Sequence, residues 1–538
     1  MNKALSPSLY YTLIVSLGGF IFGFDASVIA GANGFIDAEF NLSDWQQGFV
    51  VSSPTLGALI AMLFAGGVSD AIGRRKALIL VAFLYLLSSV GSALAPNFEL
   101  LVLSRFIGGI AFCSLIIAPL YISEISAPEN RGKMVSVNQL NIVFGFALSY
   151  FTNYYLLQLS NSGAGWVTEW SIDTHLWRYM LGLEVIPAAL WFGLLFTIPR
   201  SPRWLVLKGQ HEEAEQVINR LFDKAQASAL VEDIASSLKE KSWPFRERLG
   251  FLKAKAMRFP LMVGIIIAIA QQITGINVIF FYAPTIFEQS GVGTNAAFMQ
   301  AVWIGLVNVA FTVVAMLTID KWGRKPLLLI GLTGVVISMS ICTYGFKQAT
   351  YQVQQTAINE IQQDAPSVAI KLTPLTNDIY YSDVEFKRTL KTTLTSDEYD
   401  AYQQPLLTSS INMNAPLVLF GIIAFVASFA MSLGPVMWAM LAEIFPNQTR
   451  ALAISLVGMV NSLTSFLVQV VFPWELANLG AVNVIMFSRA VSIRGADICD
   501  HCHPRRSHQN AWFWFRAIRI ICRSRLGNMF SVGKSPPG

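Results

Sequence analysis

The chain has 538 residues, of which 54% are apolar and only 13% are charged, whereas an ordinary soluble domain has about 25% charged residues. This composition excludes a soluble globular protein, and the small net charge of +5 does not indicate a nucleic-acid partner. The 38 glycines fit the same conclusion, because Gly is more frequent in membrane helices than in soluble ones.

Long apolar segments follow one another along the chain, and about 20 apolar residues suffice for a helix that spans a bilayer. We predict eleven spanning helices, at 9–36, 47–69, 77–95, 100–123, 134–159, 179–198, 259–287, 296–319, 326–346, 414–442 and 451–472. A twelfth apolar segment begins near Ala477 and stops at Arg489, which is too short to span. The sequence therefore predicts an all-α membrane protein whose twelfth helix is incomplete or aberrant.

The polar segments differ in charge. Residues 199–258 are rich in Lys and Arg, and basic residues also follow the second, fourth, eighth and tenth apolar segments, whereas the opposite connections are acidic. Because Lys and Arg stay on the cytoplasmic side, we expect the N-terminus and segment 199–258 in the cytoplasm. Residues 347–412 contain eight acidic and five basic residues, and we predict a partly ordered insertion on the outer side.

Two sequence patterns occur twice, as Asp70-Ala-Ile-Gly-Arg74-Arg with Asp320-Lys-Trp-Gly-Arg324-Lys, and as Glu124 and Arg131 with Glu443 and Arg450. The offsets are 250 and 319 residues, and their difference of 69 is close to the length of the insertion. One duplication and one insertion explain both. We therefore predict two six-helix bundles, 1–198 and 259–488, joined by linker helices in 199–258. Such repeats are typical of secondary transporters, whose binding site lies between the halves.

The charged residues of these patterns are predicted to form a cytoplasmic charge network that latches the outward-open state. Its members are Asp70, Arg74, Glu124, Arg131, Asp320, Arg324, Glu443 and Arg450. The alternative is that the basic residues only anchor the topology.

Further motifs accompany the repeat, namely Gly-Phe-Asp25, Pro119-x-Tyr121-x-x-Glu124, Asn138-Gln139-Leu, Trp177-Arg178, Ser201-Pro202-Arg203-Trp204-Leu, Gln271-Gln272-x-Thr-Gly-Ile-Asn277, Tyr282-x-Pro284 and Gly434-Pro435-x-x-Trp438-x-x-x-x-Glu443. With these motifs the chain resembles the sugar porter family of the major facilitator superfamily, and in particular bacterial proton-coupled xylose and hexose symporters, over about residues 10–475. The resemblance implies a major facilitator fold and alternating-access transport.

Asp25 is an ionisable residue inside the first apolar segment, and Arg105 is the only basic residue of the fourth. A charge at membrane depth is costly unless it is paired, so we expect Asp25 to meet Arg105, and both are functional candidates. The resemblance implies that Asp25 takes up a proton from outside and releases it inside. The alternative is a static ion pair. Glu184, in the sixth segment, has no obvious partner, and we expect it to pair with a cytoplasmic Arg.

Amide side chains in apolar segments suit sugar hydroxyls, because an amide donates and accepts hydrogen bonds without adding charge. The resemblance implies that they bind the sugar together with an aromatic ring, the set being Gln139, Gln271, Gln272, Asn277, Asn308 and Trp438. The alternative is hydrogen bonding between helices. We also expect residues 274–277 to interrupt the seventh helix, and Tyr282 to gate the outer side.

Four features depart from the family pattern. Arg200 replaces the usual Glu, which reverses one charge of the latch, while Phe146 and Ser462 reshape the pocket. The tail, residues 489–538, has nine basic and two acidic residues and is interpreted as a frameshift product. Its Cys499-Asp-His-Cys502-His503 pattern matches a haem attachment motif formally, but we reject haem because the pattern follows the break in composition.

We conclude from the sequence that the chain is a multi-pass inner-membrane transporter, acting as a monomer, that moves a monosaccharide with protons. The alternatives are a facilitator for a sugar or an inositol-like polyol, and a transporter-like sugar sensor. No Ser/His/Asp set, metal-ligand cluster or nucleotide loop points to an enzyme, a metal or another cofactor. The expected partners are the sugar, protons and the lipid bilayer.

Overall fold

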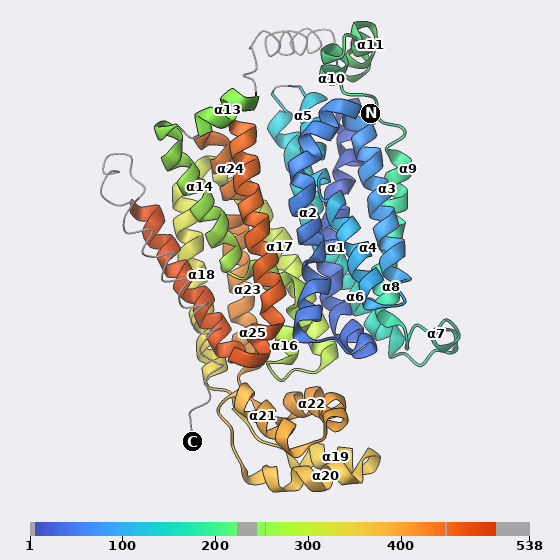
Figure 1. The fold of residues 1–538 in the computed structure, drawn as a ribbon, viewed down its shortest axis with the longest axis vertical. Helices are drawn as coiled ribbons and strands as arrows, with labels where there is room; N and C mark the ends of the chain where they lie inside the picture. Colours follow the sequence, from blue (N-terminus) through green and yellow to red (C-terminus); the bar gives the residue numbers. More distant parts are fainter. Residues whose placement is uncertain (1–5, 128, 223–244, 253, 447–448, 502–538) are drawn as a thin grey trace, which may run out of the picture.

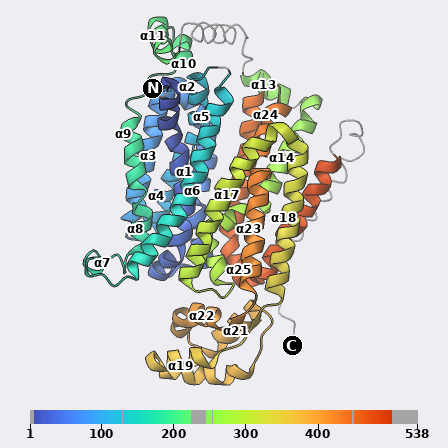
Figure 2. The same ribbon diagram turned by 180° about the vertical axis from the view of Figure 1, so that it is seen from behind.

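The computed structural model describes residues 6–127, 129–222, 245–252, 254–446 and 449–501. Two helix bundles lie side by side, with short linker helices at one end and a separate small helical unit at the other, as Figure 1 shows and the reverse view in Figure 2 repeats. We call these the linker end and the insertion end. The N-terminus lies at the linker end (Figure 1).

The first bundle is followed by the linker helices. The bundle contains α1 (Pro7–Phe40), α2 (Asp44–Ile72), α3 (Arg74–Ala93), α4 (Phe98–Ala111), α5 (Ser114–Glu124), α6 (Arg131–Ser160), α7 (Gly165–Glu169), α8 (Leu176–Gly182) and α9 (Val185–Leu194). The linker contains α10 (Pro202–Leu207), α11 (His211–Leu221) and α13 (Phe245–Leu252).

The second bundle contains α14 (Lys255–Ile273), α15 (Ile276–Phe281), α16 (Ala283–Glu288), α17 (Thr294–Trp322), α18 (Arg324–Lys347), α23 (Ala415–Met431), α24 (Leu433–Ile444) and α25 (Arg450–His501). The insertion contains β1 (Thr350–Tyr351), α19 (Gln355–Asp364), α20 (Pro366–Leu372), the 3-10 helix η1 (Thr373–Asn377), α21 (Asp383–Thr393), α22 (Ser396–Ser410) and β2 (Ile411–Asn412).

Ten helices of the described part are long and apolar enough to cross a membrane. The sequence predicts eleven, and the difference is the sixth apolar segment. Its residues fold as α8 and α9, which are separated at Leu183 and Glu184, so neither helix reaches spanning length by itself. The membrane character and the two-bundle fold predicted from the sequence are confirmed.

The last helix, α25, contains a break at Gly480, where φ is 76°. Helical backbone continues from there to His501, past Arg489, where the apolar segment ends. The change of composition therefore does not end the helix. Residues 502–538, which include most of the predicted frameshift tail, lie outside the described residues.

The sequence repeat is also a structural repeat. Gly73 ends α2 with φ 90° and ψ 150°, and Gly323 ends α17 with φ 84° and ψ 167°. A positive φ is readily adopted by Gly alone, so both motifs need Gly at this place. Each glycine turns the chain directly into the next helix, which begins with Arg74 in one bundle and Arg324 in the other.

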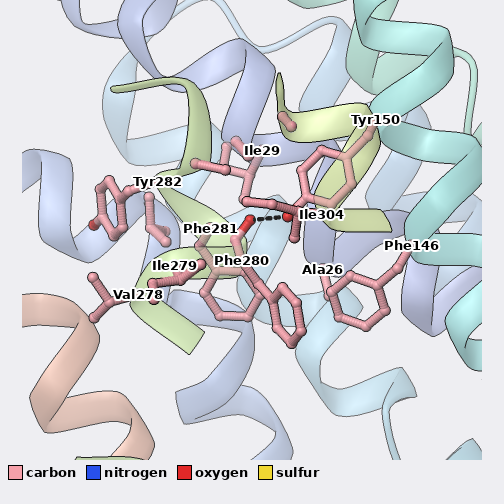
Figure 3. Packing of buried hydrophobic residues seen from close by; sticks show 14 of the residues in the cluster. Ala26, Ile29, Phe146, Tyr150, Val278, Ile279, Phe280, Phe281, Tyr282 and Ile304 are labelled. Atoms are coloured by element: carbon pink, nitrogen blue, oxygen red, sulfur yellow. Dashed lines mark hydrogen bonds between the residues drawn. The ribbon is translucent and has the colours of Figure 1, made fainter. Parts of the chain in front are cut away.

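The bundles also meet in a buried apolar cluster at their interface (Figure 3). The ring centroids of Phe146 in α6 and Phe280 in α15 are 5.0 Å apart, and the Tyr150 hydroxyl donates to the Phe280 carbonyl at 2.5 Å. Phe146, one of the departures from the family pattern, thus fills the interface with an aromatic ring instead of an amide.

Residues 347–412 form an ordered unit with its own apolar core, which includes Tyr351, Leu372, Phe386 and Leu406. The two short strands pair antiparallel and close the unit at its base. The structure thus describes more order here than the partly ordered insertion expected from the polar sequence.

Candidate functional site

Asp25 and Arg105 form the buried ion pair that the sequence predicts. Nη1 of Arg105 lies 3.2 Å from Oδ1 of Asp25. The Arg105 side chain is 2% exposed and that of Asp25 is 6% exposed. Arg105 also donates from Nε to the Val50 carbonyl at 3.0 Å. The second oxygen of Asp25 is buried without a hydrogen-bond partner. The pair therefore leaves one carboxylate oxygen in place to accept a proton.

Glu184 is a second buried carboxylate beside this pair, which differs from its predicted pairing with a cytoplasmic Arg. It is 4% exposed, is hydrogen-bonded to Ser89, and lies within electrostatic reach of both Asp25 and Arg105. The expected cytoplasmic Arg partner was wrong, because Glu184 points into the first bundle, toward Ser89, Asp25 and Arg105. The site therefore contains two carboxylates and one guanidinium.

A cluster of amides lies in the second bundle, where the seventh helix is interrupted. α14 ends at Ile273, Gly275 has φ 85°, and α15 begins at Ile276, which confirms the predicted break. The interruption places Gln272 and Asn277 against each other: Nδ2 of Asn277 donates to Oε1 of Gln272 at 2.8 Å. Irregular backbone at membrane depth is tolerated where it is buried in protein or lines a cavity.

Gln271 and Gln272 are both hydrogen-bonded to Asn461 of α25, an amide outside the predicted sugar-binding set. Asn461 donates to Oε1 of Gln271 at 2.8 Å, and Gln272 donates to Oδ1 of Asn461 at 3.0 Å. Gln271 donates in turn to the Leu433 carbonyl at 2.9 Å. Asn461 stands in an apolar segment like the other amides, so the same criterion could have found it.

The other predicted sugar-binding residues lie along the same interface, without a described hydrogen bond to this amide cluster. Gln139 is exposed and precedes Phe146 by seven residues, or about two turns, so both lie on the face of α6 that meets the second bundle. Asn308 is buried one turn beyond Gly305, which abuts Ala147 of α6.

Trp438 and Tyr282 are placed differently. Trp438 is 44% exposed, and its ring lies against Gly458, one turn before Asn461. Tyr282 is buried between α15 and α16, donates to the Gln469 carbonyl at 3.4 Å, and packs on Phe472 with ring centroids 4.9 Å apart. Trp438 is therefore partly exposed, whereas Tyr282 is enclosed.

The predicted charge network is present as two similar triads, one in each bundle. Arg74 lies 2.6 Å from Asp70 and 3.1 Å from Glu124. Arg324 lies 3.3 Å from Asp320 and 2.8 Å from Glu443. Each triad thus joins the end of one helix to a neighbouring helix of the same bundle.

The two remaining members of the network bond to backbone. Arg131 donates to the Ser123 carbonyl at 3.1 Å, and Arg450 donates to the Phe445 carbonyl at 3.2 Å. Arg200, expected to reverse a charge of the latch, pairs instead with Glu213 of α11 at 3.2 Å. That pair ties the linker to itself.

No group of three or more possible metal ligands occurs among the residues that the structure describes. Two residues of the Cys499–His503 pattern, 502 and 503, lie outside them.

Comparison with known proteins gives the family. The family described as "Sugar (and other) transporter" matches residues 11–362 and 402–495, so the interruption falls within the insertion. The D-xylose-proton symporter of Escherichia coli K12 is 32% identical over 503 residues, covering 88% of this chain and 87% of the relative. The arabinose-proton symporter of Bacillus subtilis is also 32% identical, covering 83% and 82%.

Among solved structures, a partially occluded inward-open conformation of the E. coli xylose transporter matches with a TM-score of 0.69 and 29% identity, covering 94% of this chain and all of that one. The repeated triads and the broken seventh helix indicate the same family as these matches. The chain belongs to the sugar transporter family of the major facilitator superfamily.

Proposed function

We propose that this protein moves a monosaccharide across the membrane by alternating access, together with protons. The observation that carries the proposal is the hydrogen-bonded amide cluster at the broken seventh helix, together with the buried acid–base group of the first bundle. Uncharged amides suit a polyhydroxylated solute, and the names of the relatives, which are proton-coupled transporters of xylose and arabinose, support the choice.

We assign the linker end to the cytoplasm and the insertion to the outer side of a bacterial inner membrane. The basis is the Lys and Arg content of the linker and of the connections on its side. The N-terminus is then cytoplasmic, since it lies at the linker end (Figure 1). A monomer is sufficient, because both halves of the site come from one chain.

In this assignment we infer a state that is closed outside and open inside. Near the insertion end the halves are joined by the stacked rings of Trp45 and Trp474, with centroids 6.2 Å apart, and by a hydrogen bond of 3.1 Å from Thr55 to Gln469. Gln139 and Trp438, in contrast, are exposed. A sugar held by the amides would therefore exchange with the cytoplasm.

Proton coupling is assigned to Asp25, Arg105 and Glu184. Two carboxylates facing one guanidinium leave one negative charge in excess, and a single bound proton removes it. Asp25 has the oxygen to receive that proton. When Asp25 is protonated its hold on Arg105 weakens, and Arg105 can pair with Glu184 instead. The proton thus changes which carboxylate Arg105 binds, and that change is the link to the rocking of the halves.

The sugar-binding set is assigned to Gln271, Gln272 and Asn277 with Asn461, completed by Gln139, Asn308 and Trp438 from the surrounding helices. Trp438 offers an apolar ring face to a pyranose. Tyr282 is assigned to the outer gate, where it is already enclosed. The more exposed triad of Asp320, Arg324 and Glu443 is assigned to the cytoplasmic latch.

Counterflow of labelled hexoses and pentoses in proteoliposomes, with and without a pH gradient, tests this proposal. We expect exchange without a gradient and accumulation only with an inward proton gradient. Asp25→Asn should keep exchange and lose accumulation. Accumulation by Asp25→Asn would refute the coupling assignment, and exchange with no accumulation by the unmodified protein would favour the facilitator.

A further inference from the structure

Gln469 is a fully buried amide in α25 at the insertion end, and it contacts the other bundle directly. Its Oε1 accepts the hydrogen bond of 3.1 Å from the Thr55 hydroxyl of α2. Thr55 belongs to the first bundle and Gln469 to the second, so this bond crosses the interface. It must break if the outer ends of α2 and α25 separate.

The other end of the Gln469 side chain reaches toward the amide cluster. Its Nε2 donates to the Ser465 hydroxyl at 2.6 Å, and Asn277 donates to the same oxygen at 2.7 Å. Asn277 also donates to Gln272 at 2.8 Å. An unbroken series of hydrogen bonds thus runs from Gln272 through Asn277, Ser465 and Gln469 to the opposite bundle.

We propose that Gln469 is a positioning residue that couples occupancy of the amide cluster to closure of the outer side. The proposal rests on the proposed function for the identity of the ligand, but the bond that Thr55 donates to Gln469 holds the outer side closed whatever the ligand is. Gln469 does not contact the sugar in this role. It acts through Ser465 on one side and Thr55 on the other.

The hydrogen-bond inventory explains how the coupling works. Asn277 has two N–H groups on its side chain, and the two described bonds to Gln272 and Ser465 use both. A sugar oxygen that accepts from Asn277 therefore displaces one of them. Displacement at Ser465 leaves that hydroxyl to Gln469 alone, which strengthens the hold on Gln469 in the position that accepts from Thr55.

Because Gln469 is buried, the stability of its hydrogen bonds depends on whether the outer side is open or closed. A buried amide that loses a partner without gaining water is costly, so Gln469 favours the arrangement in which Thr55 is in reach. Tyr282, assigned to the outer gate, donates to the backbone carbonyl of the same residue at 3.4 Å. The outer-gate residue Tyr282 and the interface residue Thr55 therefore both bond to Gln469.

The test measures the distance between the outer ends of the bundles. Spin labels are attached at Glu169→Cys in the first bundle and Asn478→Cys in the second, both exposed positions, and distances are measured by pulsed electron paramagnetic resonance in the full chain without sugar. Gln469→Leu removes both bonds of the series, and Thr55→Val removes only the bond across the interface. The matched control is Thr464→Val in α25, whose hydroxyl bonds within its own helix to Val460 at 2.8 Å.

We expect both Gln469→Leu and Thr55→Val to raise the ratio of outward-open to inward-open molecules about two- to tenfold, which is the usual effect of one net hydrogen bond. The combined variant should add little to either, and Thr464→Val should match the unmodified protein. Distances unchanged in Gln469→Leu and Thr55→Val, or fully additive shifts in the combined variant, would overturn the proposal.

Two further readouts separate this proposal from the proposed function. If Gln469→Leu does not accumulate in membranes, Thr55→Val alone decides on the role of the bond between Thr55 and Gln469, because it preserves side-chain volume. Sugar counterflow by the unmodified protein tests the transport function independently. A distance shift without any counterflow would support the role of this bond and refute the transport function, whereas counterflow without a distance shift would do the reverse.

Discussion

The two charge triads have the same sequence pattern and nearly the same geometry, but they differ in burial. Arg74 and Glu124 are 6% and 2% exposed in their side chains, whereas Arg324 and Glu443 are 33% and 54% exposed. The difference arises from the linker. Ser201 donates to Glu124 at 2.5 Å, and the indole of Trp204 donates to the Asp70 carbonyl at 2.9 Å, so α10 covers the first triad.

A duplicated motif can thus hold two roles. In the first triad the Arg74–Glu124 pair is buried and only Asp70 is exposed, so this pair behaves as part of the core, where an unpaired charge is costly. The carboxylates of the second triad are open to solvent, so its ion pairs contribute little to stability and are available to change partners. We therefore assign the first triad to holding the bundle together and the second to the conformational latch.

The largest effect should come from Arg74→Ala. It leaves Glu124 buried without its cation, and breaking one side of a buried pair costs about 3–5 kcal/mol. We expect a large drop in the midpoint of thermal unfolding in detergent. Arg324→Ala is the matched control in the second bundle. Equal losses in the two variants would show that burial does not distinguish the triads.

Ser201→Ala should have the next largest effect on stability. It removes a hydrogen bond to a charged group, which is worth about 1.5–3 kcal/mol, and the helix cap that the same hydroxyl provides to Trp204. Ser136→Ala is the control, because that hydroxyl is exposed and bonds only to the Gly132 carbonyl of its own helix. Thermal unfolding that is unchanged in Ser201→Ala would mean that the linker does not stabilise the first triad.

Arg324→Ala should change stability by less than about 1 kcal/mol, because exposed pairs are weak and are screened by salt. If the second triad is a latch, this variant should still lower the rate of sugar counterflow. Both quantities are measured on the same preparation, at low and high salt. A strongly destabilised protein, or an unaltered counterflow rate, would contradict the division of roles.

The smallest effect concerns an ion pair in the insertion, which serves as an external reference for exposed pairs. Lys371 donates to both carboxylate oxygens of Glu398, at 2.8 and 2.6 Å, and holds the pKa of Glu398 at about 2, below its usual 4.5. A lowered folded-state pKa gives stability that is present above pH 4.5 and is lost as the pH falls through about 2.

Pepsin digestion of the full chain between pH 4.5 and 2 measures this loss. We expect cleavage within 347–412 to increase slightly as the pH falls, and Glu398→Gln to remove that pH dependence. Digestion of the unmodified protein that does not vary with pH would contradict the assignment.

Much of this structure could be predicted from the sequence, because each membrane-spanning helix appears as a long, uninterrupted apolar segment. The repeat, the two bundles and the pairing of Asp25 with Arg105 follow from segments without charges and from single ionisable residues inside them. The break after Ile273 follows from a Gly within an amide-rich stretch. In each case one local signal is enough.

What escaped prediction depends on the orientation of helices about their own axes. Glu184 faces Asp25 because of the rotation of the sixth helix about its axis. Gly182 and Pro187 mark the irregular backbone there, but they do not give that rotation. Gln469 contacts Thr55, which lies 414 positions away in the sequence. A single sequence considered alone gives no distance between these two residues. The insertion is too polar for hydropathy to show its small core.

The strands that close the insertion place Thr350 opposite Asn412 and Tyr351 opposite Ile411. Directly paired residues of antiparallel strands have Cα atoms about 4.5–5.5 Å apart. The polypeptide therefore departs from α18 and returns to α23 at almost the same point, as it would through a simple hairpin. Because the two ends of the insertion are adjacent, its length does not set the distance between α18 and α23. A gene could therefore acquire, exchange or lose this unit while the helices on either side keep their spacing.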